Sequence, residues 1–331
     1  MNPDEKLAYA LGGVVIAGLL YLILALLFKL LGTKTVMKYF PPTVTGPMII
    51  MIGLNLAGSA VSNASTNWGL AILAIVVIII ANIWGKGMIK IIPILLGIAV
   101  SYIVALCLGL VDFTTVQNAN IIGLQKFTLA KFDITSIIIM APIAIASMME
   151  HIGDISAISS TTKRNFISDP GLHRTLIGDG LATAFAGLFG GPANTTYGEN
   201  TGVLALSKVY DPKVVRLAAY FAIILSFSPK FAALINSVPT AIIGGISFIL
   251  YGMISAVGVR NMVENKIDLT KSRNLIVIAT MFVSGLGFSS VGGVTFTIGS
   301  VTITLTGLAI AAILGVALNA ILPEKDYEFK I

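Results

Sequence analysis

The sequence has little charge, little cysteine and little histidine. Only 11% of its 331 residues are charged and 56% are hydrophobic, whereas soluble domains carry about 25% charged residues. This deficit excludes an ordinary soluble domain and indicates an integral membrane protein. The single cysteine, Cys107, lies in an apolar run, so disulfide bonds play no part. Two histidines and one cysteine exclude a structural zinc site, and no nucleophile–base pair or cofactor motif suggests an enzyme.

What is present is a series of apolar segments. A helix needs about 20 apolar residues to cross a bilayer. The start, "MNPDEKLAYA", lacks a basic n-region and a small-residue cleavage site, so no signal peptide is expected. We predict eleven spans, near residues 7–29, 41–61, 68–85, 88–111, 134–158, 172–190, 195–209, 214–235, 238–258, 274–290 and 299–321.

The basic residues orient these spans. Of the 21 lysines and arginines, 17 fall in one set of alternate loops. The other loops hold Lys6, Lys126, Lys131 and Lys230. The positive-inside rule then predicts a multi-pass protein of the cell (inner) membrane, surrounded by lipid, with a cytoplasmic C-terminus and Met1 outside. The net charge of +6 is therefore an orientation signal, whereas a nucleic-acid footprint would cluster on one face.

Two segments resemble each other. "PPTVTGPMIIMIGLNLAG" (Pro41 to Gly58) and "VPTAIIGGISFILYGMISAVG" (Val238 to Gly258) share a Pro-Thr start and an early glycine. The loop charges give them opposite directions, which predicts an inverted-topology repeat; chance similarity of two apolar helices is the alternative. A complete pair would be seven plus seven spans, so we expect the chain to lack its first three spans, as a truncated chain or one that begins at an internal methionine.

Carboxylates occur within the predicted spans, where ionisable groups are costly and often functional. Glu150 and Asp154, in "ASMMEHIGD", share a helix face at i and i+4. Both cannot ionise cheaply, so one is expected to hold a proton; alternatively, Asp154 is solvated at the cytoplasmic end. His151 points off that face and is left out of the predicted site. Asp179 has a structural or gating role, or pairs with a basic residue near the cytoplasmic mouth.

The most polar run is "GGPANTTYGENTGV", residues 190–203. Pro192 and the glycines break the helix, and the run's asparagine and threonines, including Thr196, can cap a new one. Non-helical backbone at membrane depth survives only where protein buries it or where it lines a cavity. We therefore predict a half-helix start that aims free N–H groups, Glu199 and Asn200 at a midplane cavity. The alternative is an ordinary polar loop with a helix cap.

These residues resemble the nucleobase–ascorbate transporter family, and most closely its bacterial uracil permease branch. The resemblance is carried by "NTTYGENTGVLALSKVY", "EHIGD", "PPTVTGPMIIMIGL", "IIPILLG", "DPGLHR" and "GGISFILYGMISAVGVRNMVE". The family signature is Gln, Glu or Pro, then Asn-x-Gly, four residues, Thr, and Arg, Lys or Gly. Here it reads "ENTGVLALSK", with Ser207 where threonine is usual, a mild departure because the hydroxyl remains.

The resemblance implies an all-α integral membrane fold with an inverted seven-plus-seven repeat, a core domain and a gate domain. It also implies that a strand from the missing spans pairs with "ANTTY", so that this chain holds one side of the site. Family members often dimerise through the gate. The implied assignment is core for residues 1–30, 134–213 (with the substrate-binding half-helix) and 214–236, and gate for 31–133 and 237–331, which ends at the cytoplasmic C-terminus.

The resemblance also implies roles for residues. Glu150 and Glu199 would bind the base, alongside the backbone of Tyr197 and Gly198. Uracil permeases carry Glu at the Glu199 position, where the xanthine and urate branch carries Gln. Proton coupling falls to Glu150 and Asp154, with the proton gradient as energy source and no cofactor. Asn200, Asp179 and Thr196 are expected to support the site.

Three hypotheses stay open at this point. The first is a proton-coupled uracil symporter that works by alternating access. The second keeps the fold and changes the substrate. It is a xanthine or other purine permease, since Asp154 and Asp179 are common in purine members, or an anion transporter of the wider architecture. An anion transporter would be expected to carry a basic residue near the half-helix, and none lies there. The third is a truncated, non-transporting fragment.

Overall fold

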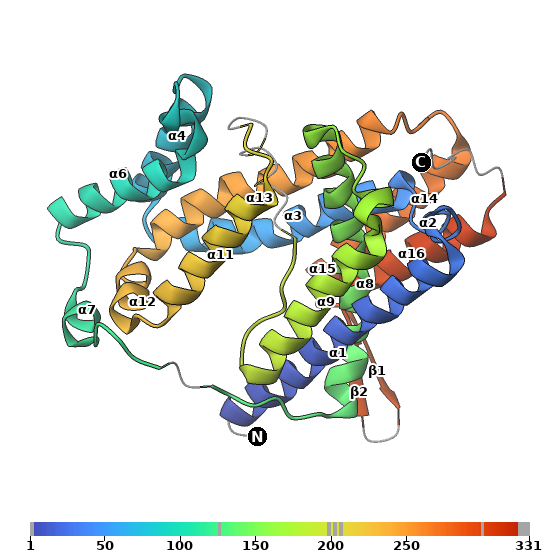
Figure 1. Cartoon of the computed structure of the whole chain (residues 1–331), viewed down its shortest axis with the longest axis horizontal. Coiled ribbons are helices and arrows are strands. Elements are labelled where there is room, and N and C mark those ends of the chain that lie inside the picture. The colour runs from blue at the N-terminus through green and yellow to red at the C-terminus, as the bar shows by residue number, and fades with distance from the viewer. Residues whose placement is uncertain are drawn as a thin grey trace. The chain divides into compact units, whose positions relative to one another are not determined.

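The structure is a computed structural model of the whole chain (Figure 1). It describes residues 3–124, 127–196, 208–298 and 301–323, together with Asn200 and Leu204. Helices make up most of these residues. They are α1 (Pro3–Leu31), α2 (Thr33–Met37), α3 (Pro42–Ala64), α4 (Trp68–Ile83), α5 (Met88–Ile91), α6 (Pro93–Cys107), α7 (Thr114–Asn118), α8 (Ile134–Thr162), η1 (Ile167–Gly171), α9 (Leu172–Phe189), α11 (Pro212–Ser226), α12 (Pro229–Asn236), α13 (Thr240–Glu264), α14 (Ser272–Phe282), η2 (Val283–Gly287), α15 (Phe288–Ser290) and α16 (Gly307–Ile321).

Several of these helices are long and apolar enough to cross a membrane. Within the described part of the chain, five helices have that length and composition, and the bent pair α11–α12 would make a sixth. The five are Glu5–Leu31, Pro42–Ala64, Ile134–Ser159, Thr240–Glu264 and Ser272–Ser290, and three shorter apolar helices are Trp68–Ile83, Pro93–Cys107 and Gly307–Ile321. The chain is therefore a helical, multi-pass membrane protein, and the count of eleven spans stays a prediction.

Two of the predicted spans are broken in the structure. The segment predicted at 214–235 forms α11 and α12, which meet at an angle of 96°. Ser228 accepts a hydrogen bond from the Phe231 amide and so caps α12, and Pro229 occupies its first turn, where no N–H is needed. The segment predicted at 88–111 begins as the short α5 and restarts at Pro93 as α6. Proline and capping residues thus end helices that hydropathy alone would continue.

A β-hairpin occupies the start of the last predicted span, which was expected at residues 299–321. β1 (Val294–Ile298) pairs antiparallel with β2 (Val301–Leu305), with Val294 opposite Leu305. α16 then starts at Gly307, capped by the Thr306 hydroxyl. The hairpin is a departure from the all-α prediction, and its alternating β-branched and apolar residues are the pattern of a strand.

By its internal contacts the chain divides into two compact units. Unit 1 comprises residues 1–55, 127–198 and 254–331, and unit 2 comprises residues 56–126 and 199–253. The boundaries fall within α3 and α13. The core and gate domains are defined by relative movement, so that assignment stays a prediction.

In unit 1, α1 packs along α9 and α8 (Figure 1). The cluster between them includes the fully buried Tyr21, Leu172 and Leu176. Glycines allow the close approach: a Cβ on Gly18 would lie 2.6 Å from the Gly180 carbonyl oxygen, and a Cβ on Gly180 would lie 2.7 Å from that of Gly18. Small residues at such crossings let membrane helices approach closely, as the glycine- and alanine-rich sequence of α9 predicts.

The two segments that resemble each other, α3 and α13, also meet in unit 1. A Cβ on Gly46 would press on Met262, and a Cβ on Gly258 would press on the backbone of Ile50. The Ser255 hydroxyl donates to the Ile50 carbonyl at 3.0 Å. Residue numbers rise on one helix as they fall on the other, so the two helices run antiparallel.

Unit 2 has its own apolar core. α4 packs on α6, and Leu70, Ile78, Ala105, Ile242 and Ile246 are buried in the cluster that includes residues of both helices and of α13. Helix packing of this kind positions α13 within the unit, while the polar groups discussed next lie in unit 1.

Candidate functional site

Within unit 1, helix α8 carries three ionisable side chains, Glu150, His151 and Asp154, within little more than one turn. Asp133 caps its start by accepting hydrogen bonds from the Thr135 and Ser136 amides. About three turns before its end, Glu150 is half-buried, and the nearby His151 and Asp154 are 4% and 2% exposed. Burial of Asp154 excludes the alternative that it is simply solvated at the end of the span.

The helix break predicted at residues 190–192 is present. α9 ends at Phe189, and Gly190 follows with φ of +104°, in the left-handed region where glycine is favoured. The Gly191 amide still donates to the Ala186 carbonyl at 2.8 Å, which closes the end of the helix. Pro192 offers no N–H, and residues 191–196 continue without helix or strand.

Side chains of α8 and α9 hold this non-helical segment. The Asn194 amide donates to the Thr183 hydroxyl at 3.2 Å. The Thr195 hydroxyl donates to Glu150 Oε2 at 3.2 Å, and Thr196 Oγ1 lies 2.7 Å from His151 Nδ1. Successive residues of the segment are therefore tied to α9 once and to α8 twice, which satisfies polar groups that would be costly at membrane depth.

His151 lies at the centre of a buried polar cluster. Its Nε2 is 3.0 Å from Thr175 Oγ1, and its Nδ1 is 3.1 Å from Asp179 Oδ2. Thr175, Asp179 and Thr183 follow one another at spacings of four residues on α9, so they share one face of the helix. That face is turned to His151 and Asn194.

The structure thus places His151 in a buried polar cluster against α9, and its exclusion from the substrate site stays a prediction. A residue one position after Glu150 is rotated by about 100° on the helix, and this rotation turns His151 toward α9. Asp179 contacts this histidine, whereas Arg174 is exposed, so the alternative of a basic partner at the cytoplasmic mouth does not apply to Arg174. The polar stripe on α9 was the signal in the sequence that could have identified the cluster.

Helix α1 closes the cluster from a third side. The Tyr21 ring meets the His151 ring edge-on, with centroids 6.2 Å apart, and Tyr21 is 2% exposed. Packing of an aromatic edge against the imidazole fixes the ring plane of His151.

Several predicted site residues lie outside the described residues. These are Tyr197, Gly198 and Glu199, whose roles stay predictions. Asn200 is in a helical position and exposed. Of the predicted residues that are described, the structure brings Glu150, Asp179 and Thr196 together through contacts with the segment or with His151.

The arrangement suits recognition of a polar, hydrogen-bonding ligand. A half-buried carboxylate, oriented by a hydroxyl, can accept N–H groups. Among the described residues, no three histidine, cysteine or carboxylate side chains gather in a way that could hold a metal ion.

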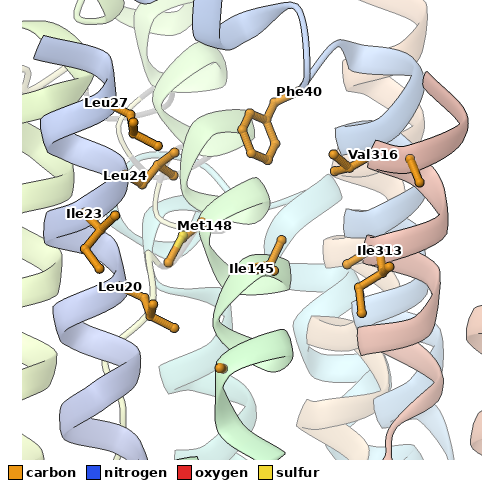
Figure 2. A pocket seen from close by; sticks show the side chains of 12 residues that line it. Leu20, Ile23, Leu24, Leu27, Phe40, Ile145, Met148, Ile313 and Val316 are labelled. Carbon is orange, nitrogen blue, oxygen red and sulfur yellow. The ribbon is translucent and has the colours of Figure 1, made fainter. Parts of the chain in front are cut away.

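A separate cavity in unit 1 has the opposite character. Figure 2 shows the side chains that line it, and its volume is about 590 Å³. The lining comes from α1, α8 and α16 with Phe40, and includes Leu20, Ile23, Leu24, Leu27, Ile145, Met148, Ile313 and Val316. All of its lining side chains are apolar, so it offers nothing to bind the N–H and carbonyl groups of a polar ligand.

Comparison with known proteins identifies relatives along nearly the whole chain. A family model described as "Permease family", of xanthine and uracil permeases, matches residues 2–294. The chain is 40% identical over 333 residues to a probable uracil permease of Haemophilus influenzae, covering 97% of this chain and 78% of that protein. It is 40% identical to the uracil permease of Bacillus subtilis, covering 96% and 77%. A putative pyrimidine permease of Escherichia coli is 38% identical, with 98% and 73% covered.

Proposed function

Because this chain belongs to the permease family that its sequence matches, it is a transporter and not an enzyme, and we propose that it imports uracil or a related nucleobase. Transport is coupled to protons and proceeds by alternating access. The names of the relatives support the substrate class. The observation that carries the proposal is the contact of Glu150 with Thr195, which sets a carboxylate beside the polar run.

The chemistry of uracil suits the groups in that run. Uracil offers two ring N–H donors and two carbonyl acceptors. Glu150 and Glu199 accept the N–H groups, and the backbone amides of Tyr197 and Gly198 donate to the carbonyls. Thr195 orients Glu150 for this task through its hydrogen bond at 3.2 Å.

Proton coupling falls to the two carboxylates on α8. Glu150 and Asp154 are one turn apart, and Asp154 is almost fully buried. A buried carboxyl group is cheaper to keep neutral than charged, so protonation at this pair is linked to occupancy of the site by the base. The proton gradient then supplies the energy for uptake, and no cofactor is involved.

Alternating access requires two groups of helices that move against each other. The antiparallel packing of α3 on α13 in unit 1 supports an inverted repeat, the usual construction of secondary transporters. The core and gate domains predicted above would supply the moving parts, and a homodimer would form through the gate. The protein resides in the cell membrane, with its C-terminus on the cytoplasmic side.

Uptake of radiolabelled uracil tests the proposal. The full chain is reconstituted in proteoliposomes, and uptake is compared with and without an imposed proton gradient. We expect gradient-dependent uptake that is lost in Glu150→Ala and reduced at least tenfold in Glu150→Gln, because both remove a charge-assisted hydrogen bond. Glu5→Gln is the matched control, since the Glu5 side chain is half exposed and pairs only weakly with Lys131 at 3.7 Å.

Two outcomes would contradict this proposal. If Glu150→Gln takes up uracil at the wild-type rate, the carboxylate is not part of the site. If uptake reaches the same rate and the same final level without a proton gradient, transport is not coupled to protons, and the substrate assignment is unaffected.

A xanthine or purine permease is the second candidate, favoured by the acidic residues Asp154 and Asp179 that the resemblance associates with purine members. Competition of uracil uptake by xanthine, uracil and sulfate separates these substrates. Under the uracil proposal only uracil competes strongly, and Glu199→Gln shifts preference toward purines. Unchanged selectivity in that variant would exclude Glu199 as the determinant.

A further inference from the structure

The apolar cavity of unit 1 is a groove between α1, α8 and α16 (Figure 2). Its volume is about 590 Å³. It is open to the outside, because the lining side chains of Ile23, Leu27 and Ile313 are 56%, 41% and 42% exposed. Packed proteins hold few voids larger than a water molecule, and a space with apolar walls stays dry. A groove of this size therefore needs an apolar occupant.

The groove runs along the half of α1 that ends at a membrane surface. Its lining on α1 extends from Leu20 to Leu27, which covers about 10 Å along the helix axis. The helix itself ends four residues later, at Leu31. One leaflet of the hydrocarbon core is about 15 Å thick. The groove therefore has the depth and the direction of an acyl chain in one leaflet.

The wall that α8 contributes is one continuous apolar face. Ala141, Ile145 and Met148 follow one another at spacings of four and three residues, so they lie on the same side of the helix. Figure 2 shows Ile145 and Met148 between α1 and α16. Walls of this kind offer many dispersion contacts to a hydrocarbon chain and no partner to a charged group. The charged end of an amphipathic molecule would have to stay at the mouth of the groove.

The mouth of the groove at Phe40 lies at the membrane surface. Figure 2 shows Phe40 at this end, between Leu27 and α16. The adjacent Tyr39 is 48% exposed, and tyrosine is enriched where the hydrocarbon meets the headgroups. Near the end of α16, the Asn319 side-chain amide donates to the Lys38 carbonyl at 2.8 Å. The backbone before Phe40 is therefore fixed to the wall of the groove.

Three lysines accompany this mouth. Lys29 follows the lining residue Leu27 by two positions, and Lys38 precedes the lining residue Phe40 by two. Lys34 lies between them on α2, and all three lysines are exposed. Among the described residues, none of the three forms an ion pair. Lysines next to the membrane attract the headgroups of anionic lipids, so the charge at this mouth is complementary to a phosphate.

We propose that the groove binds an anionic phospholipid of the surrounding membrane, with one acyl chain between α1, α8 and α16 and its phosphate at Lys29, Lys34 and Lys38. The apolar walls account for the acyl chain, and the lysines account for the charge of the head. A protein segment in the groove would satisfy the walls and leave the lysines without an anion. The site is separate from residues 190–203 and does not rest on the proposed transport of a nucleobase.

Quenching of tryptophan fluorescence by brominated lipid tests the site in the full chain. The two native tryptophans, Trp68 and Trp84, are exposed and belong to unit 2, so both are replaced by phenylalanine. One tryptophan is then introduced by Ile23→Trp or by Leu26→Trp. These positions form a matched pair on α1, since they are 56% and 52% exposed and, of the two, Ile23 lines the groove. Each protein is placed in vesicles of phosphatidylcholine and phosphatidylglycerol in which one lipid at a time is brominated.

The expected result is a lipid preference confined to the groove. Phosphatidylglycerol is preferred over phosphatidylcholine at Ile23→Trp by at least about fivefold, the contribution of one lysine near an anionic headgroup. Leu26→Trp, which contacts the bulk lipid, shows about equal quenching by the two lipids. Addition of Lys29→Gln and Lys38→Gln removes the preference at Ile23→Trp. Lys86→Gln, which changes an exposed lysine of unit 2, is the matched control and leaves the preference unchanged.

Two quenching results would overturn the proposal. Equal lipid preferences at Ile23→Trp and Leu26→Trp would mean that the groove selects no lipid that the bulk membrane does not. If neither brominated lipid quenches Ile23→Trp, protein fills the groove, either from this chain or from a second copy.

Native mass spectrometry gives a second measurement that needs no introduced tryptophan. The wild-type chain is transferred into mild detergent from vesicles that contain both lipids, and we expect it to retain one phosphatidylglycerol per chain. The variant with Lys29→Gln and Lys38→Gln loses this lipid, whereas Lys86→Gln keeps it. A wild-type chain without bound phosphatidylglycerol, or a lysine variant that retains as much as wild type, would refute the site.

Discussion

The crossing of α1 and α9 gives a quantitative prediction from two glycines on one helix. A Cβ on Gly180 would lie 2.7 Å from the Gly18 carbonyl oxygen and 2.6 Å from Tyr21 Cβ, whereas ordinary contact begins at 3.4 Å. The helices must therefore separate by about 0.8 Å to admit Gly180→Ala. A Cβ on Gly178, two residues earlier, would meet nothing within 4 Å.

The two alanine substitutions form a matched pair. Each gains about 1 kcal/mol of intrinsic helix propensity, so their difference isolates the packing cost, which is about 1–3 kcal/mol for overpacking against backbone. We expect Gly180→Ala to lose its folded, monodisperse state several degrees below Gly178→Ala. The assay is size-exclusion chromatography of heated samples in detergent, scored as a ranking because heating is irreversible there. Equal melting temperatures for the two variants would refute the close crossing.

Two further predictions concern single hydroxyl groups. Thr195→Val removes the hydroxyl donor to Glu150 and is expected to weaken nucleobase binding by about tenfold, whereas Thr195→Ser keeps the hydroxyl and retains affinity. Isothermal titration calorimetry of both variants measures the two affinities. Equal affinities for the two variants would contradict the role of the hydroxyl. In the exposed loop before α14, hydrogen bonds from the Thr270 side chain and backbone hold the pKa of Asp268 below its ordinary value. The stability that the Asp268 carboxylate contributes is therefore present above its unfolded-state pKa and is lost as the pH falls through its folded-state pKa. We expect Thr270→Val to raise the pKa of Asp268 measured by NMR. The variant should be less stable than wild type only at pH values above the unfolded-state pKa of Asp268.

The site depends on side chains to hold a segment that has no secondary structure of its own. Asn194, Thr195 and Thr196 are each tied to a hydroxyl, carboxylate or imidazole of α8 or α9. These ties come from helices that are themselves fixed by glycine-mediated packing. A shift of α9 is therefore expected to change the position of Asp179 and of the segment together, which links the stability prediction to the site.

Much of the fold follows from hydropathy and from a few residues with strong local preferences. Apolar length predicted α1, α3, α8 and α13 closely, because a bilayer requires about 20 apolar residues per span. The glycines and Pro192 predicted the end of α9, because left-handed backbone and a missing N–H both stop a helix. Hydropathy did not predict the 96° bend between α11 and α12 or the hairpin before α16, since both depend on capping and strand pairing.

The candidate site was predicted less completely. Glu150 and Asp154 were identified because carboxylates are costly at membrane depth. The contacts of His151 with α9 were not predicted, because the spacing rule for one helix says which residues share a face and says nothing of which neighbour each face meets. Thr175 and Thr183 were missed for the same reason, since hydroxyl groups are common on membrane helices and only their alignment on α9 distinguishes them.

The amino-acid sequence by itself determined the membrane class, the approximate spans, the break before the polar run and the family, because each depends on composition or on local residue pattern. Only the tertiary structure decided that the break is held by α8 and α9, and that Asp179 contacts His151. Those contacts join residues 24 to 45 positions apart. Such pairings depend on how closely glycine-lined helices approach and on which faces then meet, which no local pattern specifies.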